Sequence, residues 1–261
     1  MSDILSLNRQ AWNRQSTDAT SPWVQPVDTA TIERARQGDW QVILTPNKVV
    51  PRTWFADIRD QDVLGLASGG GQQVPTLAAA GARLTSFDNA EEQLAKDRMV
   101  ADREGLSIAI EQGDMADLSR FDDACFDLIF HPVANVFSAD IRPVWLECYR
   151  VLRPGGRLLS GFMNPCFYLF DHQAIEAGAA MQVCFELPYA DTDHLDEIAL
   201  QARVEQGLGI EFGHSLDDQI GGQTAAGFVI AGFYEDRWSN EATPLNRYMP
   251  TSMATLALKM E

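Results

Sequence analysis

Short apolar runs alternate along the chain with longer stretches that contain charged or small residues. The runs have no helical period, which is typical of buried strands, and the longer stretches end at stop signals such as Gly81 and Gly105. We expect strands over residues 62–66, 82–87, 107–112, 126–130, 157–162, 228–234 and 253–259, and helices over 6–14, 29–37, 72–80, 90–104, 141–150 and 215–226. This alternation predicts an α/β domain.

The first predicted strand leads directly into a glycine-rich loop. The strand Asp62–Leu66 ends at small residues, and the segment Ala67–Gly71 has almost no side-chain bulk, so a ligand can approach its backbone closely. The helix Gln72–Ala80 follows, and Pro75 is tolerable there because it lies in the first turn. Strand, glycine loop and helix in this order are the opening of a nucleotide-type α/β domain.

An acidic residue ends the second predicted strand. Asp88 lies 19 residues after Gly69, and an acid at this place can accept hydrogen bonds from both hydroxyls of an adenosine ribose. Asn89 and Gln93 begin the next helix beside it. We expect these two amides to lie within reach of the ribose or of the loop backbone.

Five segments together resemble the class I S-adenosylmethionine (SAM)-dependent methyltransferases: Leu66–Gly71, Asp88, Gly113–Met115, Phe126–Phe130 and Arg150–Gly156. They match the family in order and in spacing over roughly residues 60–165. The resemblance implies a Rossmann-like, doubly wound, mostly parallel seven-stranded sheet with an antiparallel last strand. It also implies SAM as the cofactor and methyl transfer as the activity.

The resemblance further implies which residues hold the cofactor. In related enzymes the adenine lies at the position of Asp114, whose carboxylate accepts from the exocyclic amine, and the apolar neighbour Met115 covers a ring face. The full set of expected cofactor-binding residues is Ala67, Ser68, Gly69, Gly71, Gln72, Gln73, Asp88, Asn89, Gln93, Gly113, Asp114, Met115 and His131.

Two positions depart from the family's first motif. The family usually has an acidic residue where this chain has Gly65, and a glycine where it has Ala67. The acid commonly orients the loop or the methionine end of the cofactor. Ser68 and the amides of the loop are the candidates to replace that contact.

His131 follows the fourth predicted strand, and Asn135 comes four residues later. Two roles are open for its ring: a hydrogen bond to the cofactor or to a backbone carbonyl, or catalysis as a general base. A base helps when the methyl acceptor is a hydroxyl or an acidic carbon, and less when it is a thiolate or an amine. His214 and Tyr189 are further candidates for the base.

We divide the chain into four parts. Residues 1–60 are an N-terminal helical lid or extension, 61–165 the SAM-binding core, 166–212 a substrate-cover insertion, and 213–261 a helix and the last two strands of the core. Three tryptophans of the first part either cover the cofactor or anchor the segment to the core: Trp12, Trp23 and Trp54.

The insertion does not follow the plain strand–helix repeat. We expect a helix over residues 168–179, a strand over 181–187, and a second strand over 208–212 that pairs with it. Insertions at this place commonly build the substrate cover in the superfamily. The acceptor pocket is therefore expected under residues 166–212.

Charge and composition exclude several partners. Lys and Arg total 20 against 37 Asp and Glu, a net charge of −17, and nucleic-acid binding needs clustered basic residues. The four cysteines have no CxxC spacing, so no metal site is expected. No signal peptide or membrane-spanning run is visible. We expect a cytoplasmic protein with a small-molecule acceptor, and nothing in the sequence specifies an oligomeric state.

Two other functions compete with methyl transfer to a small molecule. An NAD(P)-dependent oxidoreductase would also use Gly69, Gly71 and Asp88, but Val74 stands where its third glycine should be. The chain also has no Tyr-xxx-Lys pair downstream of the fourth strand. The other competitor is a SAM-binding sensor without catalysis, and Gly65 in place of the acid favours it.

Overall fold

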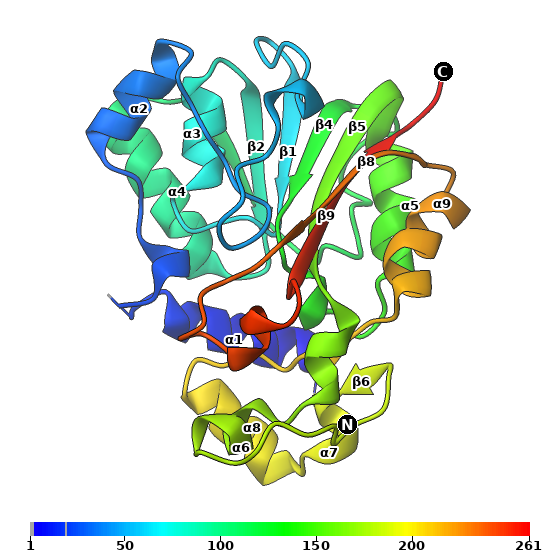
Figure 1. The fold of residues 1–261 in the computed structure, drawn as a ribbon. Coiled ribbons are helices and arrows are strands. Elements are labelled where there is room, and N and C mark those ends of the chain that lie inside the picture. Colours follow the sequence, from blue (N-terminus) through cyan, green and yellow to red (C-terminus); the bar gives the residue numbers. More distant parts are fainter. Residues whose placement is uncertain (1–2, 19) are drawn as a thin grey trace.

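The computed structural model of the chain describes residues 3–18 and 20–261. Within these ranges a seven-stranded sheet has the order β3-β2-β1-β4-β5-β9-β8 (Figure 1). Neighbouring strands are parallel except at β9, which pairs antiparallel with both β5 and β8. The strands are β1 (Asp62–Leu66), β2 (Arg83–Asp88), β3 (Ile108–Gln112), β4 (Phe126–His131), β5 (Leu152–Met163), β8 (Val229–Asp236) and β9 (Ser252–Leu258). The fold predicted from the sequence is confirmed.

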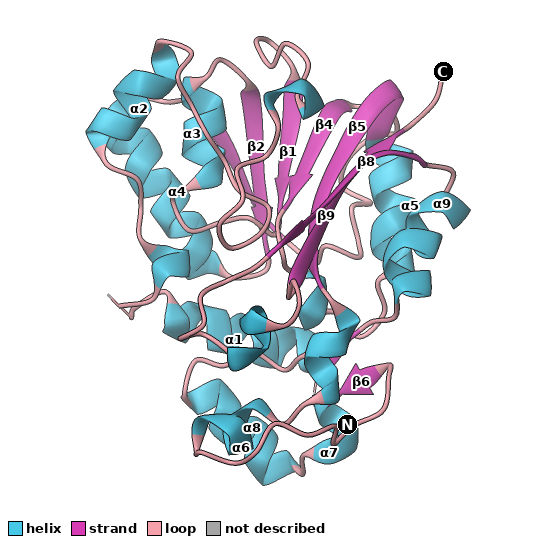
Figure 2. Cartoon of the chain, viewed as in Figure 1, coloured by secondary structure: helices cyan, strands magenta, loops and turns pink. Residues whose placement is uncertain are grey.

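Helices cover both faces of this sheet, as the doubly wound topology requires. In Figures 1 and 2, α2, α3 and α4 lie on one face, and α5 and α9 lie on the other. The helices are α1 (Ile4–Gln15), α2 (Thr29–Arg36), α3 (Gln73–Ala79), α4 (Glu91–Glu104), α5 (Arg142–Val151), α6 (His172–Glu176), α7 (Asp191–His194), α8 (Glu197–Glu205) and α9 (Gly222–Ala225).

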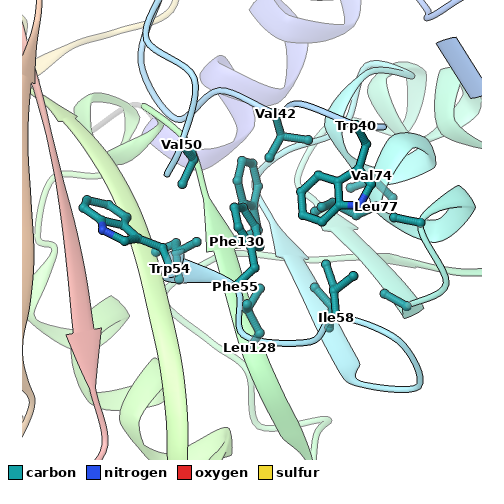
Figure 3. Close-up of a cluster of buried hydrophobic side chains, with 14 of the residues drawn as sticks. Trp40, Val42, Val50, Trp54, Phe55, Ile58, Val74, Leu77, Leu128 and Phe130 are labelled. Carbon is teal, nitrogen blue, oxygen red and sulfur yellow. The ribbon is translucent and has the colours of Figure 1, made fainter. Parts of the chain in front are cut away.

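Each face of the sheet has its own apolar core. On one face, α2 and α3 pack together with residues 40–58 against the strands; Figure 3 shows Trp40, Phe55 and Val74 in this cluster beside Phe130 of β4. On the other face, α5 packs on the sheet around the fully buried Trp145. The two cores hold the carboxyl ends of β1, β2 and β4 side by side along one edge.

The segment before β1 has two different roles. Trp54 is buried in the core, and its ring centroid lies 5.2 Å from that of Tyr234, so it anchors the segment rather than covering a ligand. α1 instead lies beside the carboxyl ends of the strands (Figure 1). The ring of Trp12 in this helix packs edge-on against Phe137 at 5.2 Å.

The insertion 166–212 differs from its prediction. Within the expected helix 168–179 the structure has the end of a 3-10 helix (Pro165–Leu169) and the short helix α6. Val183 makes an isolated bridge with Phe170 where a strand was expected over 181–187. The side chain of Val183 is 67% exposed, so the alternating pattern there faces no core that would fix a strand. The described insertion instead holds a short antiparallel pair, β6 (Tyr189–Ala190) with β7 (Phe212–Gly213).

The helix expected over residues 215–226 begins as predicted but changes its winding. The amide of Asp218 donates to Ser215 Oγ at 3.1 Å, which is the hydrogen bond of a helix N-cap. Residues 217–221 are a π-helix, and α9 follows. A Cβ on Gly222 would lie 2.6 Å from a ring carbon of Trp145, so glycine lets this helix approach α5 closely.

Across residues 3–18 and 20–261, no helix combines the length and the apolar character that crossing a membrane requires.

Candidate functional site

The glycine loop leaves β1 with a left-handed backbone. The φ angle is +48° at Ala67, +118° at Gly70 and +78° at Gly71. Glycine adopts these angles freely, whereas Ala67 pays roughly 1 kcal/mol. Its amide donates to the carbonyl of Phe87 at 2.7 Å. Position 67, where the family usually has glycine, thus has a left-handed φ that favours glycine, although the residue here is alanine.

The carboxylate of Asp88 binds the loop from the end of β2. Its Oδ2 accepts from the amide of Gly69 at 3.1 Å, and its Oδ1 accepts from the amide of Ala90 at 2.9 Å. Burial raises the pKa of Asp88, and these backbone hydrogen bonds act in the opposite direction. A carboxylate offers about four lone-pair positions, so the half-buried group keeps acceptor capacity for a ligand hydroxyl.

A second carboxylate, that of Asp97 in α4, binds the loop two residues further on. Asp97 Oδ1 accepts from the amide of Gly71 at 2.7 Å, and Oδ2 accepts from Ser86 Oγ at 2.6 Å. The sequence analysis did not identify this residue. Its spacing was the available signal, because Asp97 follows Leu94 by three residues and precedes Val100 by three, and both neighbours are buried.

Asn89 and Gln93 lie beside Asp88 but are engaged with the N-terminal helix. Asn89 Oδ1 accepts from Arg9 Nε at 3.0 Å, and Asn89 Nδ2 donates to the carbonyl of Leu5 at 2.9 Å. Gln93 Nε2 donates to Ser16 Oγ at 2.8 Å. The structure thus brings both amides to the expected place, where they hold α1 against the site.

Gln72 and Gln73 hold the segment that follows α1. Gln72 Nε2 donates to the carbonyls of Pro22 and Gln25 at 2.7 and 2.9 Å. Gln73 Oε1 accepts from the amide of Ile43 at 3.0 Å. These contacts draw the N-terminal segment over the start of α3, directly after the glycine loop.

A cavity of about 370 Å³ lies beside the two glutamines. Trp23 and Trp238 stand at its wall with their ring centroids 5.2 Å apart, and the rest of the lining is mostly apolar. Its lining includes no residue of the insertion 166–212. A flat apolar group of a small molecule fits such a wall.

The turn after β3 contains the expected adenine residues. Asp114 Oδ1 accepts from the amide of Ala116 at 3.0 Å, so the carboxylate shapes the turn and leaves its other oxygen for a ligand. Met115 is half-buried against the core around α5. Gly113 is required here, because a Cβ would lie 2.3 Å from the ring of Phe87.

His131 is completely buried, and both of its ring nitrogens face the protein. Nδ1 lies 2.9 Å from the carbonyl oxygen of Leu66, and Nε2 lies 2.7 Å from Asn135 Oδ1. Burial lowers the pKa of this imidazole, which favours the neutral ring. Asn135 in turn donates to Gln219 Oε1 at 2.9 Å in the π-helix. A general-base role would require the ring to leave both partners, so the geometry favours the backbone-carbonyl interpretation.

The two weaker candidates for a base are also engaged with the protein. His214 Nε2 lies 2.9 Å from the carbonyl oxygen of Ser138, and the ring is buried. Tyr189 donates its hydroxyl to Asp191 Oδ1 at 2.8 Å, and burial, followed by that carboxylate, raises the pKa of the phenol. Neither group is poised to accept a proton.

One buried hydroxyl of the loop is left for a ligand. Among the described residues Ser68 Oγ has no hydrogen-bond partner. A Cβ added to Gly65 would lie 2.7 Å from this oxygen and 2.5 Å from a methyl of Val74. The space for the family's acidic side chain is thus occupied by Ser68 and Val74. The unpartnered Ser68 hydroxyl and the spare acceptors of Asp88 and Asp114 fit a cofactor that has a ribose, an amine and a polar tail.

Metal-ligating side chains do not gather in the part of the chain that the structure describes. No group of three or more His, Cys, Asp or Glu residues there could hold a metal ion, and the cysteines are free.

Comparisons with known proteins identify the family and the fold. Residues 64–160 match the family described as Methyltransferase domain. Over 260 residues the chain is 45% identical to the Bacillus subtilis (strain 168) protein named uncharacterized methyltransferase YbaJ, with 100% of both chains covered. Two solved structures share the fold. An S-adenosylmethionine-dependent methyltransferase from Mesorhizobium loti has a TM-score of 0.60 at 16% identity, over 79% of this chain and 94% of that one. An arsenic(III) S-adenosylmethionine methyltransferase from Chlamydomonas reinhardtii has a TM-score of 0.52 at 18% identity, over 91% and 74%.

Proposed function

The chain belongs to the class I SAM-dependent methyltransferases, and from this premise we propose that it binds SAM at the glycine loop and methylates a small molecule. The observation that carries the proposal is the contact between Asp88 and Gly69. It places a carboxylate with spare acceptor capacity directly on the amide of a left-handed glycine loop. Family membership favours this function over the oxidoreductase.

Different residues of the site would bind different parts of SAM. Asp88 would accept from the ribose, Asp114 and Met115 would hold the adenine, and Ser68 with the loop amides would meet the methionine end. When bound, SAM supplies an electrophilic methyl group on a cationic sulfur. The chain's task is to place an acceptor in line with that methyl and to exclude water, and placement alone can supply much of the acceleration.

We assign His131 a positioning role rather than a proton transfer. Its ring lies between the carbonyl of Leu66, the last residue before the loop, and the amide of Asn135. A neutral ring has one N–H, so it donates to one of these groups. Joint rotation of the Asn135 and Gln219 amides would let Asn135 donate to the other nitrogen and accept from Gln219. The ring thereby fixes where the loop leaves β1.

Water exclusion rests on α1 and on the insertion packed against it. Ala11 of α1 lies in a small apolar core with residues of α8 and with Phe212 of β7. Asn8 adds a partly buried hydrogen bond from its Nδ2 to the carbonyl of Phe137 at 2.8 Å. We propose that α1 and residues 166–212 together cover the site, with the acceptor beneath them.

The cavity at Trp238 is a second possible binding place for the acceptor, besides the space under α1 and residues 166–212. Two substitutions distinguish between these two places. Trp238→Ala removes a wall of the cavity, whereas Tyr189→Ala changes the insertion. The substitution that raises the KM for the acceptor while leaving SAM affinity unchanged marks the place where the acceptor binds. Both rings have aromatic partners, so each variant is first checked for its thermal unfolding temperature.

The experiment that tests the function is turnover of SAM to S-adenosylhomocysteine. The full chain is incubated with SAM and with small molecules grouped by nucleophile: thiols, amines, phenols and carbon acids. We expect one group to yield S-adenosylhomocysteine, and we expect Asp88→Ala to raise the KM for SAM in that reaction. Saturable SAM binding without turnover in any group would instead favour the non-catalytic sensor.

A further inference from the structure

Asp97 is a carboxylate buried where a helix normally places an apolar side chain. Its exposed fraction is 0%, and it lies between the buried residues Leu94 and Val100 on the inner face of α4. Its two oxygens bind the amide of Gly71 and the hydroxyl of Ser86 at 2.7 and 2.6 Å. One side chain therefore ties together the glycine loop, β2 and α4.

Burying this carboxyl group costs free energy, and none of the described groups that act on it is a cation. The charged group that acts on it is Asp88, which is also acidic, and burial together with that charge raises the pKa of Asp97. A leucine or alanine at this helix position would pack without that cost. Burial of Asp97 thus destabilises the fold, and its hydrogen bonds to Gly71 and Ser86 are the contacts that oppose this cost.

The hydrogen bonds of Asp97 complete a series along the loop. Asp88 binds the amide of Gly69, the backbone carbonyl of Gln93 accepts from the amide of Gly70 at 3.0 Å, and Asp97 binds the amide of Gly71. Three successive amides are thus held by Asp88 at the end of β2 and by two groups of α4. The left-handed φ angles of Gly70 and Gly71 are fixed from this side.

Position 65, just before the loop, provides no side-chain anchor. Gly65 has no side chain, and the space for one is taken by Ser68 Oγ and a methyl of Val74. The acid that commonly orients the loop in related enzymes is therefore absent, while Asp97 binds the loop from the neighbouring helix.

We propose that Asp97 is a positioning residue for the cofactor site: through Gly71 it holds the glycine loop in the shape that binds SAM, in place of an acid at position 65. This inference rests on the proposed function. Asp97 itself touches no ligand, because both of its oxygens point to protein groups. It acts on the cofactor through the backbone of the loop.

The test is calorimetric titration of the full chain with S-adenosylhomocysteine, with the unfolding temperature measured in parallel. Asp97→Ala should raise the Kd about 10–100-fold, because the amide of Gly71 loses its buried acceptor. Asp97→Asn should recover most of that loss, since its amide oxygen can accept from Gly71 and its nitrogen can donate to Ser86 Oγ. Asp102→Ala, on the exposed face of the same helix, is the matched control and should leave the Kd unchanged.

A merely structural role gives a different pattern. In that case Asp97→Ala would lower the unfolding temperature while the folded protein keeps its wild-type Kd, and the proposal would be overturned. If Asp97→Ala does not fold, Asp97→Ser serves instead, because its shorter side chain is polar but cannot reach Gly71; a wild-type Kd in that variant overturns the proposal equally. Failure of the wild-type chain to bind S-adenosylhomocysteine would reject the proposed function itself.

Discussion

The imidazole Nδ1 of His131 lies 2.9 Å from the carbonyl oxygen of Leu66, so the end of β4 is joined to the end of β1 at the point where the glycine loop begins. The ring is fully buried, and its other nitrogen faces Asn135. This contact makes His131 part of the support of the loop.

Substitutions of His131 separate support from base catalysis. His131→Ala should lower the free energy of unfolding by about 1–3 kcal/mol, because it leaves buried polar groups unpaired, and should weaken SAM binding. His131→Gln should restore much of both, since an amide can still donate to Leu66 and bond to Asn135. Denaturant unfolding and calorimetry measure the two effects. A rate loss of about 10²–10⁴-fold in both variants with SAM affinity intact would instead identify a general base.

The stability of the chain should depend on pH through Asp97. Burial raises the pKa of this carboxyl from 3.8 to about 7, so between those values the folded chain binds a proton that the unfolded chain has released. The free energy of unfolding therefore falls as pH rises from about 4 to 7. Asp97→Asn removes this contribution, and its advantage over the wild type should grow by about 1–3 kcal/mol from pH 5 to pH 7. Urea unfolding at the two pH values measures it, and parallel profiles for the two proteins would contradict it.

Gly65 is required by its neighbours in the core. Gly65→Ala should destabilise the fold by about 1–3 kcal/mol, because the new Cβ would lie 2.5 Å from a methyl of Val74. The double variant Gly65→Ala with Val74→Ala should lose less than the sum of the two single variants, since the clash with Val74 is removed and only that with Ser68 Oγ remains. Denaturant unfolding of the four proteins gives the coupling free energy. Strictly additive losses would mean that Val74 does not occupy the space.

Asn8 joins α1 to the insertion across 202 residues of sequence. Its Oδ1 accepts from the amide of Ile210 at 2.6 Å, and the side chain is 3% exposed. Asn8→Ala should lower the free energy of unfolding by about 1–3 kcal/mol, because buried backbone groups lose their partner. Gln10→Ala, on the exposed side of α1, should have little effect. Equal unfolding free energies for the two variants would show that α1 is not held by Asn8.

Most ends of the core strands could be predicted to within a few residues, because each strand is a short apolar run that is followed by a turn signal. β1 matches its prediction over residues 62–66, and β4 extends one residue beyond it to His131. The carboxyl ends of such strands meet at one edge, so the places of Asp88 and Asp114 also followed from the sequence. Both residues lie at or just after the strand ends, where the apolar pattern places them.

The remaining features depend on partners that the local pattern does not specify. Asp97 binds an amide 26 residues away, and Asn8 contacts the insertion; neither partner is visible in a helical repeat. The strand expected over residues 181–187 failed because alternation predicts a strand only where one face is buried, and Val183 is exposed. His131 was recognised as a polar residue at a strand end, but the partners of its two nitrogens come from the fold.

The central claim is tested most directly by calorimetry. The affinities for SAM and for NADH are measured for the wild-type chain and for the Asp88→Ala variant. We predict saturable SAM binding and none of NADH. Asp88→Ala should weaken SAM binding by about 1.5–3 kcal/mol, the value of hydrogen bonds to a charged group. The control Asp122→Ala, an exposed acid, should bind SAM as the wild type does. An unchanged SAM affinity in Asp88→Ala, or binding of NADH in place of SAM, would contradict the account.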